Sequence, residues 1–231
     1  MDTGTVELVE KYKPNLDVLR AMKRIELLAT VGPSASGKTT LMNRLVDSDP
    51  NFAMVVDETT RVARRGETDG VDFAFRRREE VLAEMRNGEL VQVALGPNGD
   101  FYCTRADSYP EKGISLLALV PAAVREFRRL PIKKFQAAFI VPASYGLWQS
   151  WLHKQAEAGG WDETKMAGRM AEARQSYEFA LADERMEFVL NDDVEKATTR
   201  LRQVGLGEAP DDGIKARQTA EENYQKLIDQ K

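Results

Sequence analysis

IELLATVGPSASGKT, residues 25–39, is the stretch of the chain that decides the fold. Residues 25–31 form a largely apolar run that stops at Gly32, and such a run predicts a buried β-strand. Residues 32–39 match the pattern G-x-x-x-x-G-K-[ST] at every fixed position, and a helix-like stretch, residues 38–47, begins at the lysine. A strand, a glycine-rich loop and a helix in this order predict a loop that binds phosphate groups.

The chemistry expected of this loop follows from its residue types. Glycines let backbone N–H groups wrap around a polyphosphate, and the N-terminus of the following helix adds the positive end of its dipole. The amine of Lys38 is expected to reach the β- and γ-phosphate oxygens, and the hydroxyl of Thr39 is expected to bind Mg²⁺. We therefore expect ATP and Mg²⁺ as cofactors, with an ATP site made by Gly32, Ser34, Ser36, Gly37, Lys38, Thr39 and Thr40.

Short apolar runs alternate with helix-like stretches along the rest of the chain. Further strands are expected at residues 52–56, 114–120, 136–141 and 186–190, and further helices at residues 122–130, 145–156, 163–182 and 192–204. This alternation predicts an α/β fold with a doubly wound, mostly parallel, five-stranded sheet. One insertion interrupts it, because the charged residues 58–113 mix strand signals at 71–75 and 90–94 with a helix at 79–87.

The composition excludes several classes of protein. No run approaches the roughly 18 apolar residues that a membrane-spanning helix needs, and the first residues lack the pattern of a secretory signal. The single cysteine cannot form an internal disulfide, and one cysteine with one histidine nearly excludes a structural zinc site. The net charge of −4 does not indicate DNA as a partner, although local basic patches leave a DNA acceptor open. We expect a cytoplasmic protein with no membrane partner, as a monomer or homodimer.

A second motif, TTRVARRGETDGVDF at residues 59–73, follows the second predicted strand. Its arginines Arg61 and Arg64 are three residues apart and can converge on one anion, because guanidinium groups suit phosphate oxygens. The stretch matches T-T-R-x-x-R-x-G-E-x-x-G-x-D-[YF] downstream of the phosphate-binding loop. On these two motifs, the chain resembles the guanylate kinase family over roughly residues 25–204.

The resemblance implies an ATP-dependent phosphotransferase with a P-loop kinase fold. In the family, residues at the positions of Arg61, Arg64 and Tyr102 hold the phosphate of the acceptor. Arg169 matches a lid arginine that stabilises the transferring group, so Lys38 and Arg169 are candidate catalytic residues. Phe73 stands where the family usually has a phosphate-binding tyrosine. The candidate acceptor-binding residues are Asp57, Arg61, Arg64, Glu67, Phe73, Gln92, Tyr102 and Thr104.

The same resemblance implies a domain organisation. We expect a guanylate kinase-like domain at residues 25–204, which contains an acceptor-binding insertion at 58–113 and a helical lid at 144–172. An N-terminal extension, residues 1–24, has one helix-like stretch at 15–23, and a C-terminal helical extension covers residues 205–231. All three tryptophans, Trp148, Trp151 and Trp161, fall in the lid segment, where they either form a stacking surface for a base or pack the lid on the core.

The positions that read guanine in the family are altered. Asp57 stands at the position of a serine, and Gln92 at that of a glutamate. The strand that normally ends in Asp-x-Asp has Ala118 and Val120 at the acidic places, and Trp151 replaces an arginine at the start of the lid. A glutamine cannot replace a glutamate neutrally, because one acceptor becomes a donor. The base preference is therefore expected to differ from that of the family.

Asp57 also has two interpretations besides base recognition. A phosphate acceptor is already anionic and needs no general base, whereas a hydroxyl acceptor benefits from one. Asp57 is thus a third candidate catalytic residue, for a kinase that phosphorylates an alcohol. The alternative is an ordinary turn aspartate that caps the following backbone.

Three functions remain open from the sequence. The first is transfer of the γ-phosphate of ATP to a nucleoside or deoxynucleoside monophosphate, with altered base specificity. The second keeps the fold but uses a hydroxyl acceptor, such as ribose bisphosphate or a hydroxymethyl-modified base in nucleotide or DNA. The third is a catalytically reduced binding module. The expected partner is accordingly a nucleotide or a phosphorylated small-molecule acceptor.

Overall fold

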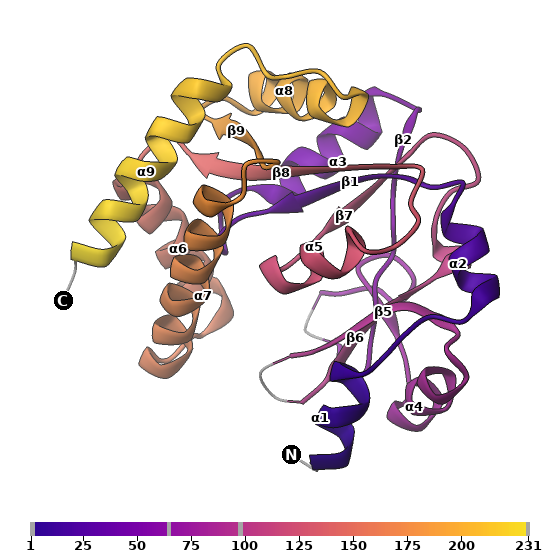
Figure 1. The fold of residues 1–231 in the computed structure, drawn as a ribbon. Helices are drawn as coiled ribbons and strands as arrows, with labels where there is room; N and C mark the ends of the chain where they lie inside the picture. The colour runs from indigo at the N-terminus through magenta and orange to yellow at the C-terminus, as the bar shows by residue number, and fades with distance from the viewer. Residues whose placement is uncertain (1–2, 64–65, 97–98, 230–231) are drawn as a thin grey trace. The chain divides into compact units, whose positions relative to one another are not determined.

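The computed structural model describes residues 3–63, 66–96 and 99–229 (Figure 1). The chain divides into two compact units, and each is described by itself. Unit 1 contains residues 1–27, 53–117 and 125–135, and unit 2 contains residues 28–52, 118–124 and 136–231. The acceptor motif lies in unit 1, and the phosphate-binding loop lies in unit 2.

The main sheet confirms the predicted fold class. It has five strands in the order β2-β7-β1-β8-β9. Their bounds are β1 (Glu26–Val31), β2 (Phe52–Met54), β7 (Ile114–Ala118), β8 (Lys134–Pro142) and β9 (Glu187–Asn191). Strands β8 and β9 are parallel, with Ile140 opposite Val189. The strand order differs from the chain order, so helical crossovers connect the strands, as a doubly wound sheet requires.

The helices of unit 2 cover the strands that carry the loop. Helix α3 (Lys38–Ser48) follows the loop and packs on α8 (Val194–Leu206). Gly205 fits this packing closely, because an added Cβ there would lie 2.6 Å from the ring of Phe52. Helix α6 (Tyr145–Gly159) and the first half of α7 (Glu163–Ala182) fall in the predicted lid segment, and α7 continues beyond its end at residue 172. Helix α5 (Pro121–Phe127) follows β7.

Unit 1 holds a second, four-stranded sheet in the order β4-β3-β6-β5. The strands are β3 (Glu58–Thr59), β4 (Ala74–Phe75), β5 (Leu90–Leu95) and β6 (Phe101–Arg105), with the short helix η1 (Ala106–Ser108) after β6. Helix α4 (Arg78–Asn87) ends at Gly88, which has the left-handed φ of +71° that a helix stop of this kind needs. Five side chains form the buried core of this sheet and helix: Val81, Met85, Leu90, Phe101 and Cys103.

The N-terminal residues pack onto that core. The sequence predicts one helix before residue 25, and the described residues 3–24 form two, α1 (Thr3–Glu10) and α2 (Leu16–Met22). Leu8, Val9 and Tyr12 pack against the core of the four-stranded sheet. The Tyr12 hydroxyl donates to the Leu90 carbonyl at 2.6 Å and accepts from the Leu90 N–H at 2.8 Å. This hydroxyl therefore satisfies both backbone groups of one residue on β5, the strand at the end of the sheet.

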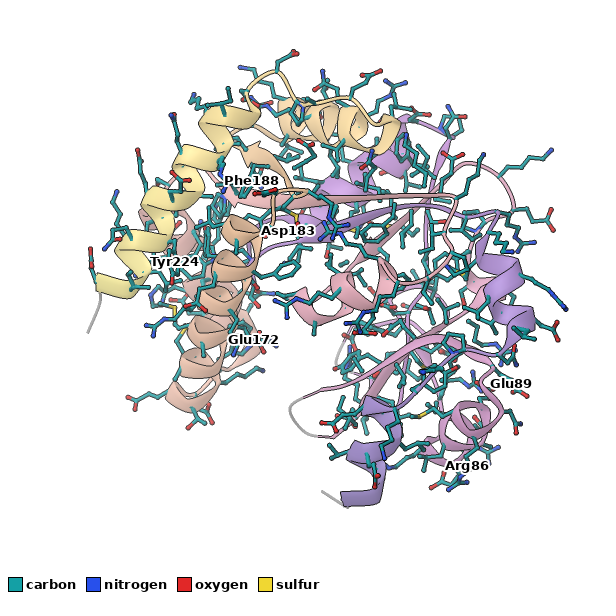
Figure 2. All side chains as sticks on the ribbon, in the orientation of Figure 1. Arg86, Glu89, Glu172, Asp183, Phe188 and Tyr224 are labelled. Atoms are coloured by element: carbon teal, nitrogen blue, oxygen red, sulfur yellow. The ribbon has the colours of Figure 1, made fainter. Side chains whose placement is uncertain are left out.

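The C-terminal helix α9 (Gly213–Asp229) packs on α7, α6 and β9, and Figure 1 shows it running beside α7. The buried amide of Asn223 donates to the Pro142 carbonyl at 2.8 Å, where β8 ends. Tyr224, labelled in Figure 2, donates to Glu178 of α7 at 2.9 Å. The predicted helical extension is thus joined by polar contacts to the end of β8 and to α7.

Within the described ranges, no helix combines the length and the apolar character that crossing a membrane demands.

Candidate active site

The backbone of the phosphate-binding loop needs its glycines. Gly32 has a φ of +149° and Gly37 a φ of +94°. A Cβ on Gly37 would lie 2.4 Å from Nδ2 of Asn191, and one on Gly32 would lie 3.0 Å from the Ile140 carbonyl oxygen. Ala35, between them, also has a left-handed φ, of +61°. Larger side chains at the two glycines would therefore collide with Asn191 and with the backbone of Ile140.

Two side chains from distant parts of unit 2 hold the loop through hydrogen bonds to its carbonyl groups. The indole N–H of the buried Trp148 donates to the Ser34 carbonyl at 2.8 Å. The amide of the buried Asn191 donates to the Ser36 carbonyl at 2.9 Å. Trp148 is on α6 and Asn191 ends β9, so the lid segment and the last strand both contact the loop. For Trp148, the packing interpretation is confirmed, because its ring has no exposed surface.

Lys38 opens helix α3 and folds back over the loop. Its ammonium group donates to the carbonyls of Gly32 at 2.7 Å and Pro33 at 2.8 Å. Burial, with the nearby positive charge of Arg169, lowers the pKa of Lys38 to about 8. A partly desolvated cation on a concave loop attracts anions strongly, because little water screens its charge.

A cavity of about 310 Å³ lies beside this lysine, entirely within unit 2. Arg169 and Glu172 line it from α7, and Figure 2 labels Glu172 there. The two side chains form an ion pair at 2.6 Å, and the Arg169 guanidinium lies 5.5 Å from the centre of the Trp161 ring. Lys38 and Arg169, the two predicted catalytic cations of unit 2, therefore line one cavity.

The same cavity is lined by the two residues that stand at the acidic positions of the family's Asp-x-Asp. Ala118 and Val120 line it, and neither can bind a metal ion. In the described parts of the chain, no three His, Cys, Asp or Glu side chains gather where they could hold a metal. The hydroxyl of Thr39, on the first turn of α3, fits a magnesium ion that takes its other ligands from nucleotide phosphates and water. The buried Ser36 hydroxyl, which has no partner among the described residues, adds a polar group at the loop.

Unit 1 assembles the predicted acceptor site around Arg61. The Arg61 guanidinium donates to both carboxylate oxygens of Glu67, at 2.6 and 2.7 Å. It lies over the Phe73 ring at 4.7 Å, and the Phe73 ring packs edge-on against Tyr102, 6.1 Å between centroids. The hydrogen bonds with Glu67 raise the pKa of Arg61, so the guanidinium stays charged. Arg61, Glu67, Phe73 and Tyr102 thus form one cluster, while Arg64 lies outside the described residues.

Asp57 lies directly before β3, in the same unit. Burial, together with the neighbouring charge of Glu58, raises the pKa of Asp57 to about 7. Its backbone carbonyl accepts a hydrogen bond from the Ala74 N–H at 2.8 Å, which joins this residue to β4. A carboxyl group that titrates near neutral pH suits a general base, and in its neutral form it can also donate a hydrogen bond.

Four charged side chains of unit 1 form a network of ion pairs that the motifs did not predict. Arg76 pairs with Glu58 and, at 2.7 Å, with Glu84, which also pairs with Arg105 at 2.8 Å. Glu58 keeps 7% of its side chain exposed, so it relies on these arginines to offset its desolvation. This network joins β3, α4 and β6. A sequence signal exists only for Arg76, within the run Arg76-Arg77-Arg78.

The remaining predicted acceptor residues lie on neighbouring strands. Gln92 of β5 is opposite Thr104 of β6, and both are buried. The Thr104 hydroxyl bonds to the Tyr109 hydroxyl at 2.9 Å, so Tyr109 is a polar residue of this region that the sequence did not indicate. Arg169 and the loop residues lie in unit 2, and the acceptor cluster lies in unit 1.

A strand–loop–helix phosphate cradle with a partly buried lysine, on a doubly wound sheet with an inserted second sheet, defines a P-loop kinase. The sequence comparisons narrow this class. The guanylate kinase family model matches residues 24–205, and the chain belongs to the guanylate kinase family. It is therefore an enzyme, a nucleotide kinase of the guanylate kinase type.

Individual relatives agree with this placement. A guanylate kinase from Rubrobacter xylanophilus is 32% identical over 187 residues, which cover 79% of this chain and 94% of that protein. A guanylate kinase from Aliivibrio fischeri is 31% identical, with 79% and 88% coverage. The crystal structure of guanylate kinase from Anaplasma phagocytophilum shares the fold, with a TM-score of 0.58, 24% identity, and coverage of 79% of this chain and 84% of that one.

Proposed function

We propose that the chain transfers the γ-phosphate of ATP to a nucleoside or deoxynucleoside monophosphate, and that the base it prefers is not guanine. One observation carries this proposal beyond the family: Arg61, Glu67, Phe73 and Tyr102 come together in one cluster, whereas the base-reading positions are changed. A charged guanidinium held by Glu67 and two aromatic rings suits the phosphate of an acceptor, whatever base that acceptor carries.

The donor side supports ATP with Mg²⁺. The cradle would hold the β- and γ-phosphates through loop N–H groups and Lys38, and Thr39 would hold the metal. When bound, Mg²⁺ offsets negative charge on the phosphates. Once its ion pair with Glu172 opens, the Arg169 guanidinium would place a positive charge beside the transferring phosphoryl group. Because phosphoryl transfer needs little covalent chemistry from the protein, these residues act mainly by position and charge.

The altered base preference rests on Asp57 and Gln92. Neither residue presents the same donors and acceptors as the serine and glutamate that they replace. A buried polar group left without a partner costs about 1–3 kcal/mol, enough to change the preferred base by tenfold or more. A neutral Asp57 can both donate to and accept from a base edge, and its ionised form can accept an exocyclic amino group.

A hydroxyl acceptor is the second candidate, and the pKa of Asp57 near 7 favours it. In that case, the Asp57 carboxylate takes the proton of the attacking hydroxyl. The acceptor oxygen then forms the new bond to the γ-phosphorus, while the bond from that phosphorus to the β,γ-bridging oxygen breaks and ADP leaves. Ribose bisphosphate and hydroxymethyl-modified bases, in nucleotide or DNA, are the acceptors of this class to test. The binding-module alternative is disfavoured by the intact phosphate cradle.

The test is phosphoryl transfer from radiolabelled ATP across a panel of acceptors. The panel holds all ribo- and deoxyribonucleoside monophosphates, ribose bisphosphate and hydroxymethyl-base DNA, with Lys38→Ala as the control. Label in a monophosphate other than GMP supports the first proposal. Efficient labelling of GMP alone contradicts the altered base preference, label only in a hydroxyl acceptor supports the second candidate, and wild-type turnover by Lys38→Ala refutes the donor site.

A further inference from the structure

The phosphate-binding loop contains a strained peptide whose orientation decides where one N–H group points. Ala35 is the one residue other than glycine with a left-handed φ among the described residues, at +61°. Side chains with a Cβ avoid this region because the Cβ crowds the backbone. Rotation of the peptide between Ser34 and Ala35 by half a turn changes φ of Ala35 toward the ordinary negative range. The unfavourable φ of Ala35 therefore favours a flip of this peptide.

Trp148 is placed to prevent that flip. Its indole N–H donates to the Ser34 carbonyl, which belongs to the same peptide, at 2.8 Å. The indole itself cannot move away easily, because the ring has no exposed surface and packs 5.5 Å from the Tyr145 ring. A flipped peptide would turn the Ser34 carbonyl away and leave a buried indole N–H without an acceptor, which is costly.

The direction of the Ser34 carbonyl fixes the direction of the Ala35 N–H. A trans peptide is planar, and its C=O and N–H point in opposite directions. Because the Ser34 carbonyl points at the Trp148 indole, the Ala35 N–H points away from that indole. No acceptor in the described part of the protein takes this N–H. A free N–H on a glycine-rich loop before a helix is what a phosphate oxygen binds.

We propose that Trp148 is a positioning residue for ATP, because its indole holds the Ser34–Ala35 peptide in the orientation that presents the Ala35 N–H to a phosphate oxygen. This inference rests on the proposed use of the loop as the ATP site. It assigns to the lid segment a contribution to donor binding that begins before any lid closure, since Trp148 lies on α6 and contacts the loop directly.

The test compares Trp148→Phe with Trp151→Phe. Both changes remove an indole N–H from α6, and no polar contact of Trp151 is present among the described residues. The probes are Mg²⁺-ATP and Mg²⁺-tripolyphosphate, which has neither base nor sugar, with dissociation constants from calorimetry. We expect Trp148→Phe to weaken both by about twofold to tenfold, the range that one hydrogen bond contributes, and Trp151→Phe to weaken neither.

Two further measurements separate positioning from a general loss of structure. In steady-state assays, Trp148→Phe should raise the KM for ATP and leave the KM for the acceptor within twofold. Ala35→Gly in the Trp148→Phe background should restore part of the ATP affinity, because glycine tolerates the left-handed φ and removes the reason to flip. If Trp148→Phe does not fold, benzothienylalanine at position 148 keeps the ring shape and replaces the N–H by sulfur.

The outcomes distinguish this inference from the proposed function. Equal affinities of the wild-type, Trp148→Phe and benzothienylalanine proteins for both probes overturn the inference and leave the ATP site intact. A parallel rise in both KM values, or no recovery with Ala35→Gly, also overturns it in favour of a structural role. A wild-type protein that binds neither probe refutes the proposed function itself.

Discussion

The most exact prediction concerns Asp57, whose pKa of about 7 lies far above the ordinary value of 3.8. Burial causes this rise, with a smaller contribution from the charge of Glu58. The folded protein therefore holds a proton on Asp57 at pH values where the unfolded chain has lost it. The stabilisation that this proton gives is fully present below pH 4 and is lost as the pH rises to about 7.

The magnitude follows from the two pKa values. Between them, stability falls by about 1.4 kcal/mol for each pH unit, the free energy of one pKa unit. From pH 5 to pH 8, the loss due to Asp57 is about 3 kcal/mol, most of it before pH 7. Asp57→Asn cannot ionise, so its stability lacks this dependence. The difference in unfolding free energy, variant minus wild type, should rise by about 3 kcal/mol over this interval.

Urea unfolding of both proteins at pH 5, 6, 7 and 8 measures that difference directly. Subtracting the wild-type curve cancels the other titrating groups, which both proteins share. Asp107→Asn is a matched control, because Asp107 has 73% of its side chain exposed. If this difference stays constant within about 0.7 kcal/mol from pH 5 to pH 8, the free energy of half a pKa unit, Asp57 does not keep its proton in the folded protein up to pH 7.

Three further perturbations test the site. Gly37→Ala should weaken ATP binding by about tenfold or more, because alanine resists a φ of +94° and its Cβ would displace Asn191. The control, Gly146→Ala on α6, should not change ATP binding, because the added Cβ would lie in open space. Arg61→Lys should raise the KM for the acceptor by about tenfold and leave the KM for ATP unchanged, since lysine keeps the charge but loses the bidentate hydrogen bonds to Glu67. An acceptor KM equal to that of the wild type would contradict a role of Arg61 in acceptor binding. ATP affinity should decline as the pH rises past about 8, where Lys38 loses its proton, and Lys38→Arg should abolish that decline; the same slope in both proteins would exclude Lys38 as its source.

Much of the fold could be predicted because its signals are local. The apolar run before Gly32 became β1, and the residues after the loop became α3, because strand, loop and helix all lie within one short stretch. The helix at 79–87 is also local, with Gly88 at its end, and it became α4. In contrast, β3 has two residues, and the sequence FYCTR of β6 does not alternate between apolar and polar residues, so neither strand has enough periodicity to be recognised.

The candidate site, like the fold, could be predicted only where its signals are local. The loop and Arg61 follow from motifs, whereas the contacts that support them join residues far apart in the chain. Trp148 is 114 residues from Ser34, and Asn191 is 155 residues from Ser36. No spacing rule in a single sequence links such pairs, because the sheet and its crossovers bring them together. The paired charges of Glu58, Arg76 and Glu84 are equally hidden, since each alone is typical of a solvated surface.

The hydroxyl of Tyr12 has a consequence for handling the protein. Strand β5 ends the four-stranded sheet, and the outer edge of such a strand can pair with a strand of another molecule. Tyr12 occupies both backbone groups of Leu90 on this strand, and Leu8 and Val9 cover apolar side chains nearby. A version of the chain shortened to begin at residue 24 would uncover this edge. We expect such a truncation to favour intermolecular strand pairing and aggregation, because it removes Leu8, Val9 and Tyr12 from the edge of the sheet.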